Sequence, residues 1–223
     1  MLLASLLVSL SIHAAGAAEL PRCEDARGLE RSQCRKRWSV LVYMAADNDL
    51  TPYAFWDLYE MEAGYESGQS SGRNYGGSTV RTDLVVQLDT AGDRGIRRIH
   101  VKQAREPYRS DLNLAYFQAQ SEDDVRSPVV ERLPESRANE AEKLERFLDW
   151  GTSRYPSDHY LVVVWGHGQG WAPAQAASTP RGRGFGGLAF NRTQGTFLDI
   201  PSLSDVLGRV SLNRLGGRPV DVY

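Results

Sequence analysis

The sequence predicts an α/β fold, in which helices cover a mostly parallel sheet, and three observations indicate it. Apolar runs of β-branched and aromatic residues recur along the chain, segments with helical spacing separate them, and the runs stop at glycines or acidic residues. The run at 160–165 reads Y-L-V-V-V-W and shows no polar alternation. An unbroken run of this kind is typical of a central strand that is buried on both faces of a parallel sheet. Strands that alternate with helices along the chain form such sheets.

The first predicted strand is 38–44, W-S-V-L-V-Y-M, which combines β-branched and aromatic residues. Thr51 and Pro52 then begin a helix, because threonine caps helix N-termini and proline fits the first turn. The glycine- and serine-rich stretch 65–79 is predicted to be a mobile surface loop. The apolar stripe of the helix consists of Phe55, Leu58, Tyr59 and Met61.

The second strand is predicted at 83–89, D-L-V-V-Q-L-D, and it ends in an acidic residue. The following segment, 95–102, is predicted to return as an antiparallel neighbour or an edge strand, because charged residues are interspersed among its apolar ones. Residues 105–134 are polar and irregular, so the sequence predicts no element there.

The second half of the chain supplies two more helices and a last strand. Asn139 begins one helix, and Pro201 opens the other after a glycine-rich linker at 172–187 and a short extended piece at 197–200. The final residues, 219–223, read P-V-D-V-Y and predict a strand in which the sequence stops. We therefore expect the sheet to be truncated before its later strands. The apolar faces carry Leu144, Phe147, Leu148 and Gly151 in one helix, and Leu203, Val206, Leu207 and Val210 in the other.

The composition is that of an ordinary globular protein with one core. Of the 223 residues, 41% are apolar and 24% are charged, and the formal net charge is -2. This charge leaves no basic footprint, so nucleic acid is not an implied partner.

The first 18 residues resemble a secretory signal. An apolar segment at 2–12 precedes the small residues 14–18, although no lysine or arginine stands before it. We therefore predict a signal peptide at 1–18, a pro-segment or N-terminal extension at 19–37, and a secreted or periplasmic protein. A buried or membrane-anchoring N-terminal helix is the alternative. No later stretch resembles a transmembrane span, so no membrane association is expected after the signal is removed.

The two cysteines of the chain, Cys23 and Cys34, both precede the first predicted strand. In an exported protein they could close a small disulfide loop that stabilises the fold by roughly 3 kcal/mol. Two free thiols in a flexible pro-segment are the alternative.

The strongest chemical candidate is His167, which directly follows the longest apolar run. Glycines 166, 168 and 170 surround it, and it is the only residue in 160–171 whose side chain ordinarily titrates near neutral pH. In open α/β sheets, ligands bind beyond the carboxyl ends of the strands, and an imidazole is the usual general acid or base near neutral pH. The amide of Gly168 could donate to a developing oxyanion. The alternatives are a structural histidine and a turn glycine.

Acidic residues follow the first two predicted strands at the same edge. Asp47, Asn48 and Asp49 follow the first strand, and Asp89 ends the second. Contact with calcium or with substrate could arise there, because hard cations take oxygen ligands. Helix capping and solvated strand ends explain the same residues without a ligand.

The glycines also raise a nucleotide-binding alternative, for which the signal is weak. A dinucleotide site needs a helix at the third glycine of the motif, and the W-A-P sequence at 171–173 argues against one. The second glycine motif, at 182–187, does not follow a strand. A serine hydrolase would need a G-x-S-x-G elbow between a strand and a helix. The match at 68–72, G-Q-S-S-G, instead lies inside the predicted glycine- and serine-rich loop.

Three blocks of the chain together resemble the clostripain family of cysteine peptidases. They read W-S-V-L-V-Y-M-A-A-D-N-D-L, D-L-V-V-Q-L-D and R-Y-P-S-D-H-Y-L-V-V-V-W-G-H-G-Q-G-W, in this order, and the resemblance covers 38–223. It implies a caspase-like three-layer α/β/α fold, a His/Cys dyad and cleavage mainly after basic residues, arginine above all. On this resemblance His167 is the dyad histidine, and Gly168 is a donor of the oxyanion hole.

The resemblance also implies a nucleophilic cysteine, which this sequence does not include. In the family the nucleophile lies in an Asp-Ala-Cys type motif after the next core strand, which here is Val220–Tyr223, where the sequence ends. Cys23 and Cys34 precede the first strand and are poor substitutes for it. The chain by itself is therefore expected to be inactive, with its specificity pocket also outside the sequence.

Two further expectations come from the family. Its members often mature by self-cleavage between the dyad residues, so a processing cut is expected after Arg181 or Arg183 in the linker. Calcium dependence is known in the family, which makes Asp47 and Asp49 candidate Ca²⁺ ligands, although the chemistry requires no cofactor.

The leading hypothesis is thus the N-terminal portion of a secreted clostripain-like cysteine endopeptidase. Its expected partners are protein or peptide substrates and the missing C-terminal half of its own domain. A non-catalytic caspase-like binding or inhibitory module is the main alternative, and a nucleotide-binding oxidoreductase is the third. An in-frame Asp-Ala-Cys motif downstream would distinguish the peptidase from the other two.

Overall fold

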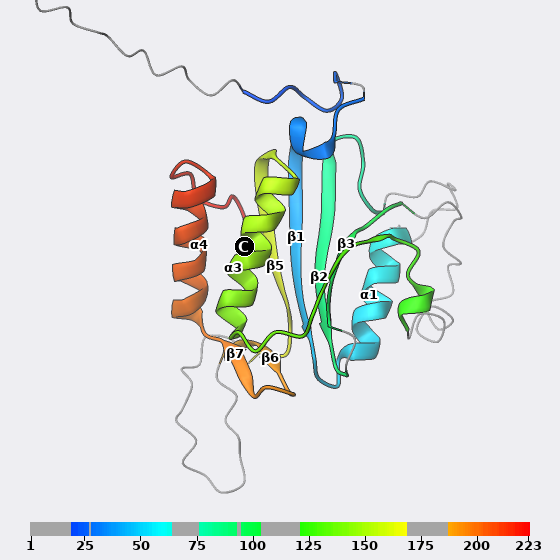
Figure 1. Ribbon diagram of the computed structural model, residues 1–223, viewed down its shortest axis with the longest axis vertical. Helices are drawn as coiled ribbons and strands as arrows, with labels where there is room; N and C mark the ends of the chain where they lie inside the picture. The colour runs from blue at the N-terminus through cyan, green and yellow to red at the C-terminus, as the bar shows by residue number, and fades with distance from the viewer. Residues whose placement is uncertain (1–18, 27, 64–75, 93–94, 104–120, 169–186) are drawn as a thin grey trace, which may run out of the picture.

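The computed structural model describes residues 19–26, 28–63, 76–92, 95–103, 121–168 and 187–223. A five-stranded sheet in the order β4-β3-β2-β1-β5 lies at its centre, and β6 and β7 form a separate two-stranded sheet (Figure 1). The strands are β1 Lys36–Ala46, β2 Thr82–Thr90, β3 Ile96–His100, β4 Val129–Leu133, β5 Ser157–Gly166, β6 Leu188–Asn191 and β7 Thr196–Leu198. The helices are α1 Thr51–Ala63, α3 Glu140–Arg154 and α4 Ile200–Arg214, with short 3₁₀ turns η1 Arg31–Gln33 and η2 Glu122–Asp124.

Two separate cores give the molecule three layers. On β1, alternate residues point to opposite faces, as the pleat of a strand requires. Leu41 and Tyr43 belong to the core under α3 and α4, whereas Val42 and Met44 belong to the core under α1. The sheet therefore lies between α1 on one face and α3 and α4 on the other, which confirms the predicted α/β/α architecture (Figure 1).

The register of the parallel strands brings three carboxyl ends together. β1 runs parallel to both β2 and β5. Ala45, near the end of β1, pairs with Asp89 of β2 and with Gly166 of β5. The polar residues that follow these strands therefore meet at one edge of the sheet, as the sequence predicted.

The position of β5 differs from the prediction of a central strand. Within the described residues β5 is the outer strand of the five, and Val163, Val164 and Trp165 are only partly buried. The predicted last strand, 219–223, contributes a single parallel bridge between Leu161 and Val222. This bridge covers only the amino-terminal half of β5, which explains the exposure of the other half.

The sequence missed one strand of the main sheet. β3 is antiparallel to β2, as predicted, but β4 pairs with its other side, so β3 is not an edge strand. β4 lies in the segment for which no element was predicted. Every second residue of β4 is exposed, and its sequence V-V-E-R-L offers no continuous apolar face. Residues 65–75 of the predicted surface loop 65–79 lie outside the described residues.

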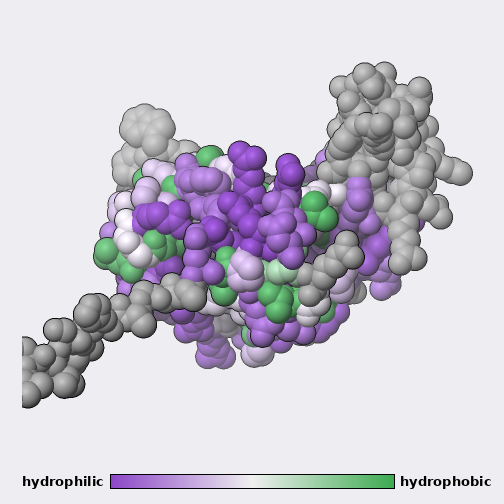
Figure 2. Space-filling model, turned by 90° about the horizontal axis from the view of Figure 1, so that it is seen from above, coloured by the Kyte–Doolittle hydropathy of each residue, from purple (hydrophilic) through white to green (hydrophobic). Residues whose placement is uncertain are grey.

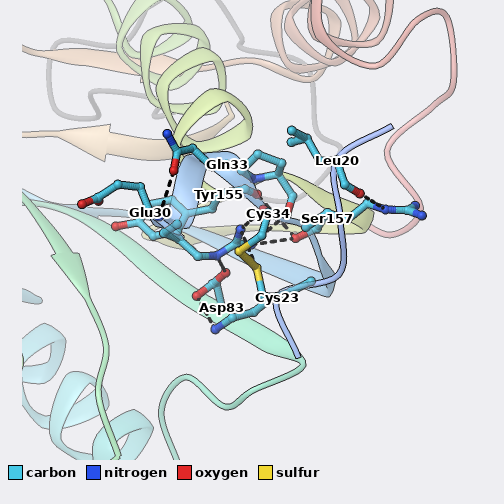
Figure 3. Close-up of a disulfide and its surroundings, with 12 residues drawn as sticks. Leu20, Cys23, Glu30, Gln33, Cys34, Asp83, Tyr155 and Ser157 are labelled. Carbon is cyan, nitrogen blue, oxygen red and sulfur yellow. Dashed lines mark hydrogen bonds and ion pairs between the residues drawn. A yellow bond between two sulfur atoms is a disulfide. The ribbon is translucent and has the colours of Figure 1, made fainter. Parts of the chain in front are cut away.

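The segment before β1 packs against the amino-terminal edge of the sheet, far from the carboxyl ends. Cys23 and Cys34 form a disulfide there (Figure 3), which decides between the two alternatives for the cysteines. Arg31 binds the carboxylate of Asp83 and donates to the carbonyl of Pro156 at 2.8 Å. Seen from this end, the surface is predominantly hydrophilic (Figure 2).

Asp83 anchors this extension electrostatically. Burial alone would raise the pKa of Asp83, but a hydrogen bond with His100 and the charges of Arg31 and Lys36 lower it to about 2. Asp83 is completely buried, so the carboxylate is ionised and paired at neutral pH.

The predicted signal peptide, 1–18, lies outside the described residues. Among the helices that the structure describes, none has both the length and the apolar character needed to cross a membrane.

Candidate active site

His167 lies directly beyond the carboxyl end of β5, at the rim of the sheet. Its side chain is 45% exposed, and its Nε2 lies 2.9 Å from Oδ1 of Asp49. The ring is thus accessible and is not part of the apolar core. This position is the one predicted, whereas its catalytic role stays a prediction.

The glycines around His167 have a steric reason. Gly166 has a φ of +151°, and a Cβ at this position would lie 2.9 Å from the carbonyl oxygen of Ala45. A side chain at Gly166 would therefore push β5 away from β1. Gly168 is exposed, and a Cβ there would approach Leu188 Cδ2 at 3.1 Å. The role of Gly168 as an oxyanion donor remains a prediction.

The three polar residues after β1 have three different surroundings. Asp47 is buried, and its Oδ1 accepts a hydrogen bond of 2.7 Å from the Thr193 hydroxyl. Asn48 is also buried, and its amide donates to the carbonyls of Ala45 at 3.1 Å and Phe190 at 2.8 Å. Asp49 is exposed and faces His167. The two predicted calcium ligands, Asp47 and Asp49, therefore have different side-chain partners, and calcium binding by them stays a prediction.

A different set of carboxylates converges at this edge within the described part of the chain. One carboxylate oxygen from each of Asp47, Asp89 and Glu135 lies within 4.8 Å of the others. Asp89 is buried, and its Oδ1 has no hydrogen-bond partner among the described residues. The Gln194 side chain donates to Glu135 Oε1 at 2.9 Å, while its own Oε1 is buried without a described partner.

Lys143 is the cation that this cluster holds. Its Nζ lies 3.1 Å from Asp89 Oδ2, 3.2 Å from Glu140 Oε1 and 3.8 Å from Glu135 Oε1, and its side chain is 1% exposed. Burial raises the pKa values of Asp89 and Glu140, and the Lys143 ammonium offsets part of that rise. Burial lowers the pKa of Lys143, but the carboxylates raise it by more.

The sequence reading missed Lys143, Glu135 and Glu140. Lys143 and Glu140 lie in the first turn of α3, and Glu135 lies in the loop before it. The available signal was Lys143 itself, because it stands directly before the apolar stripe that begins at Leu144. Lysine is almost never fully buried unless it is paired, so a lysine on the buried side of a helix indicates a carboxylate partner.

Arg181 and Arg183, the predicted processing residues, lie outside the described residues. Cys23 and Cys34 are joined to each other at the opposite edge of the sheet, so neither supplies a thiolate near His167.

A groove of about 650 Å³ borders β5 on the side that β1 does not occupy. Its apolar lining includes Val162 and Val164 of β5, Leu203 and Leu207 of α4, and Val220. Among the described residues, no strand pairs with the outer edge of the carboxyl-terminal half of β5, which borders this apolar groove.

Comparison with known proteins gives a family and several related structures. Residues 42–222 match the model of the clostripain family, a family of peptidases. Similar structures include a secreted C11 cysteine protease from Bacteroides thetaiotaomicron named iotapain, at 15% identity and a TM-score of 0.51, which covers 79% of this chain and 43% of that chain. A secreted C11 cysteine protease from the same organism, in complex with an irreversible peptide inhibitor, is 23% identical with a TM-score of 0.49, covering 77% of this chain and 39% of that chain.

A B. fragilis cysteine protease is 24% identical with a TM-score of 0.42, and the match covers 64% of this chain and 98% of that chain. No curated protein sequence matches the chain significantly. The likeness to iotapain shows a shared fold. The chain spans less than half the length of the two secreted proteases from B. thetaiotaomicron.

Proposed function

Because the chain belongs to the clostripain family of cysteine peptidases, we propose that it is the amino-terminal portion of a secreted endopeptidase that cleaves after basic residues, arginine above all. His167 is the dyad histidine in this proposal, and the amide of Gly168 is one donor to the oxyanion. The observation that carries the proposal is an accessible imidazole at the carboxyl rim of a parallel strand, paired with a carboxylate.

The nucleophile in this proposal comes from polypeptide beyond Tyr223. Val222 forms a parallel bridge with Leu161, which stands 61 positions earlier in the sequence. If the strand continues in this register, residue 228 lies opposite His167, five positions after Tyr223. A continuing strand would also cover the open edge of β5 and its apolar groove. Because the family motif lies directly after this strand, we place the proposed cysteine at or near residue 228.

The proposed reaction uses both groups in sequence. The thiolate attacks the scissile carbonyl carbon, a C–S bond forms, and the carbonyl electron pair moves to oxygen, where backbone amides hold it. Protonated His167 then gives its proton to the amine as the C–N bond breaks. Water hydrolyses the resulting thioester. The two cysteines of residues 1–223 form a disulfide with each other, so these residues alone supply no thiolate to the site and are expected to be inactive.

The test is to identify the nucleophile chemically. A polypeptide continuing through residue 228 is treated with a peptide chloromethyl ketone ending in arginine, and the modified residue is located by mass spectrometry. We expect alkylation of a cysteine at or next to that position, and new amino termini after Arg181 or Arg183 in the active preparation. A ketone ending in aspartate is the matched control and should not react.

Three outcomes would contradict parts of this proposal. Absence of a cysteine near residue 228 would favour the non-catalytic binding or inhibitory module. Equal labelling by the aspartyl ketone would exclude the basic specificity. An active enzyme with an intact 169–186 segment would exclude the proposed processing at Arg181 or Arg183.

We propose further that calcium, which family membership suggests, binds at Asp47, Asp89 and Glu135 rather than at Asp47 and Asp49. Ca²⁺ prefers oxygen ligands, and the free Oδ1 of Asp89 and the free Oε1 of Gln194 are buried oxygens near this group. Lys143 neutralises only part of the negative charge of the cluster. A bound ion would stabilise the loops around the site and would take no part in the chemistry.

Calcium titration of the chain by calorimetry checks this proposal. We expect binding with a dissociation constant of roughly 10⁻⁴ M, which is typical of extracellular sites. Glu135→Gln removes a ligand charge and should weaken binding about tenfold or more, whereas the control Asp49→Asn should leave it unchanged. Weakening by Asp49→Asn instead would favour the pair predicted from the sequence.

A further inference from the structure

We infer that Asp49 is a positioning residue for His167: its carboxylate holds the imidazole with Nε2–H toward Asp49 and leaves Nδ1 facing the reacting groups. This inference rests on the proposed function, because it assigns Asp49 a role in the peptidase reaction. It adds a third member to the predicted His/Cys dyad.

The contact itself joins two loops that the sheet brings together. Asp49 Oδ1 lies 2.9 Å from His167 Nε2. His167 directly follows Gly166, which pairs with Ala45 in the register of β1 and β5, and Asp49 lies four residues after Ala45. Among the residues that the structure describes, Asp49 is the hydrogen-bond partner of the His167 side chain. The pair is therefore a product of strand register rather than of sequence proximity.

One residue of β6, Phe190, forms hydrogen bonds with both loops. The N–H of Phe190 donates to the His167 carbonyl at 3.4 Å, and the Phe190 carbonyl accepts from the buried Asn48 amide at 2.8 Å. The N–H of Arg192 donates to the Asp47 carbonyl at 2.7 Å. Surface ion pairs lose strength largely because flexible side chains must be ordered to form them. Asp49 and His167 are short side chains on anchored backbones, so less ordering is needed here.

The helix-capping alternative does not account for Asp49. Asn48 Oδ1, rather than Asp49, accepts from the Leu50 N–H at 2.8 Å. The Asn48 carbonyl in turn accepts from the Thr51 hydroxyl at 3.0 Å, at the start of α1. The turn into α1 is thus stabilised by Asn48, and the Asp49 carboxylate is left to face His167.

The charge of Asp49 suits this role. The Asp49 side chain is 71% exposed, and a solvated carboxylate is ionised at neutral pH. An ionised acceptor at Nε2 selects the tautomer whose Nδ1 lone pair can accept a proton, and it favours the imidazolium that forms next. The same arrangement of a carboxylate behind a working imidazole recurs in hydrolases and metal sites.

Exposure sets the size of the expected effect. Loss of a buried carboxylate behind a catalytic histidine can cost about four powers of ten in kcat. The Asp49 side chain is 71% exposed, so solvent screens its charge. We therefore expect Asp49→Asn to lower kcat roughly tenfold with little change in KM.

The first experiment needs no nucleophile. In residues 1–223, ¹⁵N-resolved NMR reports the tautomer of the neutral His167 imidazole in the native chain, Asp49→Asn, Asp49→Glu and the exposed control Asp205→Asn. We expect one dominant tautomer in the native chain and a mixture of both in Asp49→Asn, because the acceptor at Nε2 is lost. Asp49→Glu should restore part of the native signal, and Asp205→Asn should not change it. An unchanged tautomer population in Asp49→Asn would overturn the inference.

The second experiment separates this inference from the proposed function. Steady-state kinetics are measured on a polypeptide that continues through residue 228 and includes the C-terminal half of the domain, with the same three variants. A tenfold loss in kcat for Asp49→Asn, partly recovered by Asp49→Glu, supports the positioning role. Equal kcat in the native and Asp49→Asn polypeptides overturns that role alone. An inactive native polypeptide overturns the proposed function, and the role of Asp49 with it.

Discussion

Replacing His167 with alanine is expected to lower kcat/KM for an arginyl peptide by about three powers of ten or more, in a polypeptide that continues through residue 228. The variant loses both the acid that protonates the leaving amine and the base that activates the thiol. Because the His167 side chain is partly exposed and packs in neither core, the fold should tolerate its removal. Initial rates on a fluorogenic arginyl substrate measure the loss.

His159→Ala is the matched control for that experiment. His159 lies near the other end of β5, where its Nδ1 is 2.8 Å from Asp221 Oδ1 and its ring packs against Trp38 at 4.7 Å. It lies on the strand that leads to His167 and is similarly exposed, at 42%, but it lies near the opposite edge of the sheet. We expect kcat/KM to stay within twofold of the native value. A similar loss in both variants would mean that the fold of β5, rather than the imidazole at 167, was disturbed.

Replacing Lys143 with methionine is expected to lower the free energy of unfolding by about 3–5 kcal/mol near neutral pH. Methionine fills a similar volume, so the main change is loss of the ammonium between Asp89 and Glu140. Two buried carboxylates then lack their cation, and Glu135 loses its nearest positive group. Urea unfolding of residues 1–223 measures the change, and the exposed Lys102→Met is the control, with an expected change of about 0.5 kcal/mol or less.

The loss in the Lys143 variant should depend on pH in a defined direction. Burial raises the pKa values of Asp89 and Glu140, and removing the ammonium raises them further. An acid whose pKa is higher in the folded state binds more protons when folded, so stability falls as pH rises through that range. The destabilisation should therefore be smaller near pH 5 than near pH 7.5. A deficit that is the same at both values would assign it to lost packing rather than to charge.

Local signals explain which elements the sequence could predict. β1, β2 and β5 are dense apolar runs, and each helix start carries a recognisable cap or proline. Asn139 caps α3 by accepting from the Glu142 N–H at 2.9 Å, and Pro201 stands in the first turn of α4. Such interactions involve residues within one turn of each other, so they are visible in a short window of sequence.

β4 and β6 depend on non-local contacts and were therefore missed. Every second residue of β4 is exposed. The strand pairs with β3, which lies more than 25 positions earlier in the sequence. β6 follows the glycine-rich linker and pairs with β7, but its side chains Leu188 and Ala189 pack in the core beneath α3 and α4. Strands of this kind are defined by what covers them rather than by their own periodicity.

From the sequence alone, three apolar strands could be predicted, with acidic residues after two of them and an imidazole between glycines after the third. The carboxylate that faces this imidazole could be identified only from the fold. Asp47 and Asp49 are two positions apart, yet Asp47 points to Thr193 and the Lys143 cluster while Asp49 reaches His167. The choice follows from the register of β1 against β5 and from β6 packed over the loop, and both are contacts between residues more than 100 positions apart.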